Sequence, residues 1–250
     1  MATQTLQGAL KTAKDKYRSF LHHEDAHNTV WRRGAPPTYH NVNKLFEEGR
    51  TKACEWAEGS LEETVQNMMK SWQTEFTHKT RTQDFRIMHP EKFKLIVNGR
   101  EALSAEETIS LGSYNSVLKS SMPDEFKYYK AHEETFDSAD DAFRNALPRG
   151  FACEVVAVYS SPPVITFKFR HWGYFEGPFK GHAPTGEMVQ LFGLVILKVD
   201  ELMRAEEVEI YYDPAELFAP LLKAPLISGP NTEQQGAASS TSPQKCPFQN

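Results

Sequence analysis

Four β-rich segments follow one another between Phe151 and Asp213, and this run limits the possible folds more than any other feature. The segments cover residues 151–159, 164–175, 188–199 and 206–212. The first two are separated by Ser-Ser-Pro-Pro at residues 160–163, and the next connection, residues 177–184, is rich in glycine and proline. Consecutive strands joined by short connections pair antiparallel. The last third of the chain therefore predicts an antiparallel sheet. We expect this sheet to curve and to wall a small-molecule pocket.

The chain ahead of this run has helical patterns. Ser60 with Glu63 and Ser104 with Glu107 both match the capping box, in which a hydroxyl and a carboxylate satisfy the first free N–H groups of a helix. The predicted helices cover about residues 61–79, 105–118 and 137–147. An extended piece at residues 93–97 leads into an Asn-Gly turn. Helices first and sheet last predict an α+β fold, with the N-terminal helices packed on one face of the sheet.

The two ends of the chain lack such patterns. Residues 1–16 are predicted to form a flexible arm, and residues 226–250, rich in Gly, Ser, Thr and Gln, a disordered tail that buries too little apolar surface to fold. The remaining residues, 17–225, are predicted to form a single α+β domain. The terminal Cys246-Pro247-Phe248 is either a short docking peptide or an inert end.

Composition argues against several classes of partner. The formal net charge is −5 and basic residues do not cluster, so nucleic acid is not an expected partner. No run approaches the about 20 apolar residues that a membrane-spanning helix needs. Three cysteines at unrelated spacings suit a reducing compartment. We therefore expect a cytoplasmic protein without membrane or nucleic-acid partners.

Motifs for cofactor chemistry are missing from the sequence. It contains no P-loop, no Rossmann glycine fingerprint, no Gly-x-Ser-x-Gly elbow and no His-Glu-x-x-His pair. The adjacent His22 and His23 raise the question of a metal, but their neighbours are charged and no third ligand is near, which favours a solvated pair. Any catalysis is expected to be free of cofactors.

The strand predicted at residues 164–175 places a histidine on its apolar face. Side chains alternate between the two faces of a strand. His171 shares its face with apolar side chains, namely Ile165, Phe167, Phe169 and Phe175. A histidine there is either a hydrogen-bonded core residue or a titratable group that lines a cavity.

The last predicted strand places Glu209, Tyr211 and Asp213 on one face. The alternate positions are Val208, Ile210 and Tyr212. If these alternate residues point inward, the carboxylates are solvated. If the sheet curves so that Asp213 reaches the cavity mouth, a carboxylate and a phenol lie beside His171 and can perform general acid–base chemistry.

The connection before the third strand resembles a known signature. Residues 177–186, Gly-Pro-Phe-Lys-Gly-His-Ala-Pro-Thr-Gly, are similar to the Gly-x-Phe-x-Gly-x-x-Pro-Thr-Gly pattern of SnoaL-like proteins. These belong to the nuclear transport factor two-like superfamily, a cone of helices and curved sheet that encloses a pocket. The chain over residues 17–223 also resembles the plant family of pathogen-related proteins. The segments that carry this second resemblance include residues 29–32, 34–39, 59–67 and 167–173 and the terminal Cys246-Pro247-Phe248.

The resemblance implies a possible reaction. SnoaL-type polyketide cyclases use an Asp on or just past the last strand as the acid and base of an intramolecular aldol closure, and Asp213 stands at the matching place. Two positions depart from the cyclase pattern: Phe175 replaces a histidine and Glu209 replaces an aromatic residue.

The resulting hypothesis is a protein that binds a small, largely apolar metabolite of plant specialised metabolism and isomerises, cyclises or dehydrates it without a cofactor. Asp213 would carry the proton, His171 and Tyr211 would orient the substrate, and Glu209 would tune Asp213 by like-charge repulsion. The alternative is a non-catalytic, defence-associated protein that binds a ligand or a partner, indicated by Asp213 on the outer surface. A third possibility is a homodimer through the sheet, with Lys168, Arg170 and Trp172 in the interface.

Overall fold

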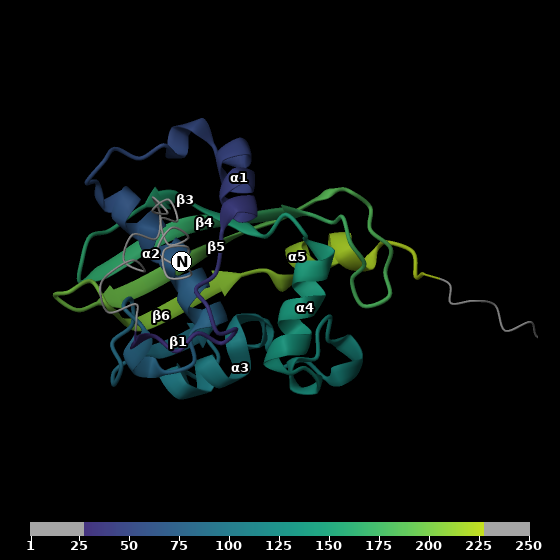
Figure 1. Cartoon of the computed structure of the whole chain (residues 1–250), viewed down its shortest axis with the longest axis horizontal. Helices are drawn as coiled ribbons and strands as arrows, with labels where there is room; N and C mark the ends of the chain where they lie inside the picture. The colour runs from purple at the N-terminus through teal and green to yellow at the C-terminus, as the bar shows by residue number, and fades with distance from the viewer. Residues whose placement is uncertain (1–27, 228–250) are drawn as a thin grey trace, which may run out of the picture.

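The computed structural model describes residues 28–227, which form an α+β structure as predicted (Figure 1). The predicted arm, the His22-His23 pair, the C-terminal tail from residue 228 and the terminal Cys-Pro-Phe lie outside the described residues. The helices are α1 (His40–Gly49), α2 (Leu61–His78), α3 (Ala105–Leu118), α4 (Phe136–Ala146) and α5 (Pro214–Leu222). The strands are β1 (Lys94–Val97), β2 (Leu103–Ser104), β3 (Ala152–Val158), β4 (Val164–Tyr174), β5 (Met188–Val199) and β6 (Ala205–Tyr212).

The strands make one six-stranded sheet in the order β2-β1-β6-β5-β4-β3. The predicted antiparallel meander is confirmed in β3 to β6, with pairs such as Phe169↔Gly193 and Val195↔Ile210. The sheet as a whole is mixed, because β1 runs parallel to β6. These two strands are far apart in the sequence, so no short turn forces them to run in opposite directions.

The predicted helices in the first half are confirmed, and their caps explain where they start. The Ser60 side chain accepts the Glu63 N–H at the start of α2, and Ser104 and Glu107 form a complete capping box on α3. The non-helical backbone of Gly112 (φ +81°) puts a kink in α3. Glycine suits this position because a Cβ there would lie 2.4 Å from the Phe136 ring. No helix in the described part of the chain is long and apolar enough to cross a membrane.

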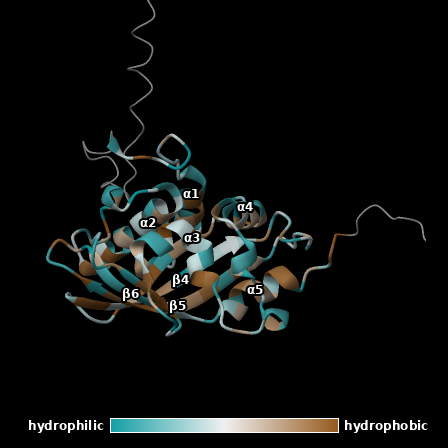
Figure 2. Cartoon of the chain, turned by 90° about the horizontal axis from the view of Figure 1, so that it is seen from below, coloured by the Kyte–Doolittle hydropathy of each residue, from teal (hydrophilic) through white to brown (hydrophobic). Residues whose placement is uncertain are grey.

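The main core lies between the helices and the inner face of the sheet. In Figure 2 the helices α2, α3 and α4 lie on one side, and β5 and β6 form the opposite border of the molecule. Inward side chains of β4, β5 and β6 share one buried cluster with these helices, including Phe167, Val195 and Val208. The outward residues Phe192 and Leu194 of β5 are 46% and 43% exposed. The sheet therefore has one covered face and one face that is open over β5.

Helix α1 covers a second, smaller apolar cluster on the outer face near β3. Phe46 of α1 stacks on Trp172 of β4 with a centroid distance of 6.0 Å, and Trp172 is fully buried. Arg170 donates to the Gly49 carbonyl oxygen at 3.1 Å. The expectation that Trp172 lies in a dimer interface is therefore wrong, because α1 of the same chain buries it, whereas an interface role of Lys168 and Arg170 stays a prediction.

Candidate functional site

The space enclosed by the sheet and the helices is filled with aromatic side chains. The buried rings in this cluster include Phe76, Phe143, Phe167, Phe169, Phe175, Phe179 and Phe218. Phe179 belongs to the glycine-rich connection and packs 5.2 Å from Phe143 and 6.3 Å from Phe218. Gly177 permits this, since a Cβ at this position would lie 1.9 Å from the Asn145 carbonyl oxygen. The motif on which the SnoaL-like resemblance rests thus closes the interior of this chain.

His171 lies on the inner face, as its position in the strand predicts. Its ring stacks on Phe151 at 4.8 Å and meets Phe169 edge-on at 5.6 Å, and its Nδ1 is buried without a hydrogen-bond partner in the described part of the chain. Burial lowers the pKa of His171 to about 4, against a smaller opposing effect of the Ala152 backbone. The imidazole is therefore neutral at physiological pH. It lines none of the clefts described below.

Glu209 and Tyr211 lie on the outer face of β6, and Asp213 follows the end of that strand. The Tyr211 hydroxyl donates to the Glu209 carboxylate at 2.8 Å, and Tyr211 is 40% exposed. The exposed Asp213 accepts the Ala215 N–H at 2.8 Å and caps α5. The structure therefore brings Glu209 and Tyr211 together, uses Asp213 as a helix cap, and shows no contact of these residues with His171 within the described part of the chain.

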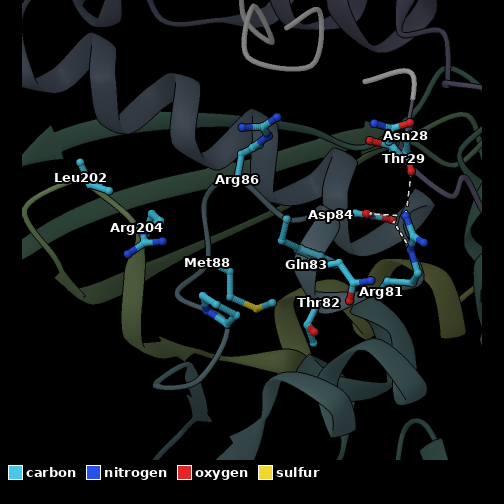
Figure 3. A pocket seen from close by; sticks show the side chains of 12 residues that line it. Asn28, Thr29, Arg81, Thr82, Gln83, Asp84, Arg86, Met88, Leu202 and Arg204 are labelled. Carbon is cyan, nitrogen blue, oxygen red and sulfur yellow. Dashed lines mark hydrogen bonds and ion pairs between the residues drawn. The ribbon is translucent and has the colours of Figure 1, made fainter. Parts of the chain in front are cut away.

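A wide cleft of about 750 Å³ lies near the turn between β5 and β6 (Figure 3). Arg81 and Arg204 line it, but each is already paired: Arg81 binds Asp84 at 2.8 Å and Arg204 binds Asp200 at 2.7 Å. In Figure 3, dashed lines join the Arg81 guanidinium to the Asp84 carboxylate. These cations are neutralised within the chain, which leaves the cleft without a free charge from either of them.

A smaller cavity of about 180 Å³ lies where β6 ends, between the C-terminal end of α3 and α5. We call it the Arg100 cavity. It has an aromatic and apolar wall with a few polar groups. The lining residues are Asn98, Arg100, Val117, Leu118, Lys119, Ser120, Ser121, Met122, Tyr128, Tyr129, Tyr212, Pro214 and Phe218. Ligand sites in proteins share this combination of a mostly apolar wall and a few convergent polar groups.

The polar groups of the Arg100 cavity are held by backbone contacts. Arg100 donates from Nε to the Val97 carbonyl oxygen at 2.9 Å and from Nη2 to the Val117 carbonyl oxygen at 3.2 Å. The Tyr212 hydroxyl donates to the same Val117 oxygen at 3.0 Å. Burial removes water from both groups, which lowers the pKa of the Arg100 guanidinium and raises that of the Tyr212 phenol. The phenol therefore stays neutral.

Sequence reasoning missed this cavity, although two signals pointed to it. Tyr212 shares its face with Val208 and Ile210, and those apolar neighbours indicate the inward direction for the phenol. The Asn98-Gly99 turn has φ values of +51° and +68°, and it places Arg100 beside the end of α3. Within residues 28–227, no group of three or more His, Cys, Asp or Glu could hold a metal ion.

Comparison with known proteins gives distant structural likenesses. No family model matches the chain. A candidate SnoaL-like polyketide cyclase from Jannaschia sp. is 17% identical, with 72% of this chain and 91% of that chain covered and a TM-score of 0.32. A protein with a ketosteroid isomerase-like fold from Catenulispora acidiphila is 11% identical, covers 63% and 93%, and has a TM-score of 0.36. Likenesses at these scores do not assign a function to the chain.

The sequence match is much closer. The "Pathogen-related protein" of Hordeum vulgare is 49% identical over 216 residues, which cover 86% of this chain and 91% of that protein. This match indicates the same family as the sequence segments that resemble plant pathogen-related proteins. The chain belongs to the family of the barley pathogen-related protein.

Proposed function

We propose that this protein binds a small, largely apolar aromatic metabolite in the Arg100 cavity. The aromatic wall at the end of β6, formed by Tyr128, Tyr129, Tyr212 and Phe218, carries the proposal. The cavity volume of about 180 Å³ suits one aromatic ring with a small substituent, because an apolar cavity of about 150 Å³ is enough to bind benzene. Aromatic side chains bury large areas and stack favourably with a bound ring.

Binding without turnover is the function that the geometry supports best. Asp213 uses its carboxylate to cap α5, and His171 is packed among rings on the other side of the sheet. A cofactor-free isomerase, cyclase or dehydratase that uses Asp213, with help from His171, Tyr211 and Glu209, is a second candidate. One observation favours it: Asp213 stands between Tyr212 and Pro214, which both line the Arg100 cavity.

The binding proposal can be tested with neutral aromatic probes. We expect phenol and indole to shift the backbone NMR signals of Arg100, Ser120 and Tyr212. Ser120→Phe should fill the cavity and abolish these shifts, whereas Leu202→Phe, a matched change in the 750 Å³ cleft, should preserve them. Shifts confined to the neighbourhood of Leu202, or shifts that survive Ser120→Phe, would contradict the proposed site.

The catalytic candidate needs a separate variant. Asn is as good a helix cap as Asp, so Asp213→Asn removes the acid while it keeps α5 capped. If turnover of an identified substrate is unchanged in Asp213→Asn, Asp213 is not the proton carrier. A loss of turnover with unchanged ligand binding would support the enzyme.

The biological setting is part of the proposal. The name of the barley relative supports a role in plant defence for this chain. The buried free thiols of Cys54 and Cys153 support a reducing, cytoplasmic location, and the net charge of −5 argues against nucleic acid as a partner. The exposed Phe192 and Leu194 on the open face of β5 support a homodimer through the sheet.

A further inference from the structure

Arg100 is a half-buried cation without an acidic partner. Its guanidinium donates to the Val97 and Val117 carbonyl oxygens, and among residues 28–227 no carboxylate lies within ion-pair distance of it. Its Nη1 is buried and has no hydrogen-bond partner in the same part of the chain. A buried charge without a counter-charge is costly, so such a group usually marks a missing partner.

The surroundings of Arg100 do not neutralise it. Val117 lies in the last turn of α3, whose carbonyl groups carry only a partial negative charge. Lys119, the next residue after that helix, lines the same cavity and adds a second positive charge. Glu101 and Glu107 line the neighbouring cavity, and neither forms an ion pair with Arg100. The Glu107 carboxylate accepts the Ser104 N–H at 2.7 Å in the capping box and interacts electrostatically with Lys119.

Arg100 also separates two cavities. The second, of about 350 Å³, lies between α3 and the β1–β2 hairpin. The two cavities share Arg100, Lys119, Ser120 and Ser121 as a common wall. The two cations and the two serine hydroxyls therefore lie on this common wall. The rings of Tyr129, Tyr212 and Phe218 line the smaller cavity.

We propose that the ligand of the Arg100 cavity is an aromatic carboxylic acid, whose ring packs among the tyrosines and whose carboxylate pairs with Arg100 at the common wall. This inference rests on the proposed function and names the class of ligand. A guanidinium binds a carboxylate through two parallel N–H···O bonds, and the N–H groups of Arg100 that the Val97 and Val117 oxygens do not use are Nη1 and the second hydrogen of Nη2. Lys119 and the hydroxyls of Ser120 and Ser121 can serve the remaining lone pairs.

The test compares acids with neutral compounds of the same shape. We would measure the binding of benzoate against benzamide and of phenylacetate against phenylacetamide by calorimetry and NMR on the full chain. Wild-type protein should prefer each acid at least about tenfold, as expected for a hydrogen bond to a charged group. Arg100→Gln should reduce this preference to about twofold or less and leave the affinity for the amides nearly unchanged.

Two controls keep the outcomes separate. Arg81→Gln removes a cation that is already paired with Asp84, and it should not alter the preference for acids. Amide binding itself reports whether Arg100→Gln still folds with an intact cavity. If acid and amide bind equally well to the wild type, the ligand class is wrong while the proposed function stands. If neither binds, the proposed function fails as well.

Discussion

His171 should make the stability of the protein depend on pH, because its pKa is about 4 in the fold and about 6.5 as an ordinary histidine. The fold holds the imidazole neutral, so the stability from this residue is complete above pH 6.5 and is lost as the pH falls from 6.5 toward 4. At pH 5 the unfolded chain has bound nearly one more proton than the native state at this position. The free energy of unfolding at pH 5 should therefore be about 2 kcal/mol lower than at pH 8 through this residue.

Urea unfolding at pH 8 and pH 5 measures this loss. With an m-value of about 3 kcal/mol/M, the midpoint of wild-type protein should fall by about 0.7 M through His171 alone. His171→Phe and His171→Gln cannot ionise, so both should lack this part of the decrease although they differ in packing. The reasoning is refuted if the two variants lose as much stability between pH 8 and pH 5 as the wild type does.

Substitutions at three further positions test how the fold is held together, and urea unfolding measures the effect of each. Gln66→Leu should lower the free energy of unfolding by about 2–4 kcal/mol. The buried Gln66 amide accepts the Val155 N–H and donates to the Cys153 carbonyl oxygen on the free edge of β3, and both backbone groups would lose their partner. A loss below about 1 kcal/mol would contradict this role. Gly177→Ala should cost at least about 3 kcal/mol, because its Cβ would collide with a backbone oxygen 1.9 Å away, and near-wild-type stability would show that the connection can move. Asp213→Ala should cost about 1 kcal/mol and Asp213→Asn almost nothing, whereas an equal loss in both would rule out the capping contact.

The fold was largely predictable because its elements depend on local patterns. The alternation of apolar residues in β4, the N-cap at Ser60 and the capping box at Ser104 operate within a few residues, so they can be recognised without the rest of the chain. The parallel pairing of β1 with β6 depends on contacts between residues more than 100 positions apart, such as Leu95↔Val208. No local pattern records a pairing of this kind.

The candidate site was harder to predict because the direction of side chains in one strand was left open. Two readings of β6 were possible, and Val208, buried at 5% exposure, decides for the one in which Glu209 and Tyr211 face outward. A shift of one residue exchanges the two faces of a strand. The phenol that lines the cavity is therefore that of Tyr212, not that of Tyr211 as predicted. The position of His171 was predicted correctly, but a position on the inner face does not distinguish a packed core from a pocket.

The filled interior explains why ligand binding is better sought at the edge of the core than at its centre. Phe179 occupies space among Phe143 and Phe218, and it is held there by the close approach of Gly177 to the end of α4. A ligand at the centre would have to displace these rings, and each loses about 3–5 kcal/mol of packing when its side chain is removed. The Arg100 cavity requires no such displacement. Its cation costs stability in the free protein, and a bound carboxylate would recover that cost. The same group that makes the empty cavity unfavourable therefore selects an anionic ligand.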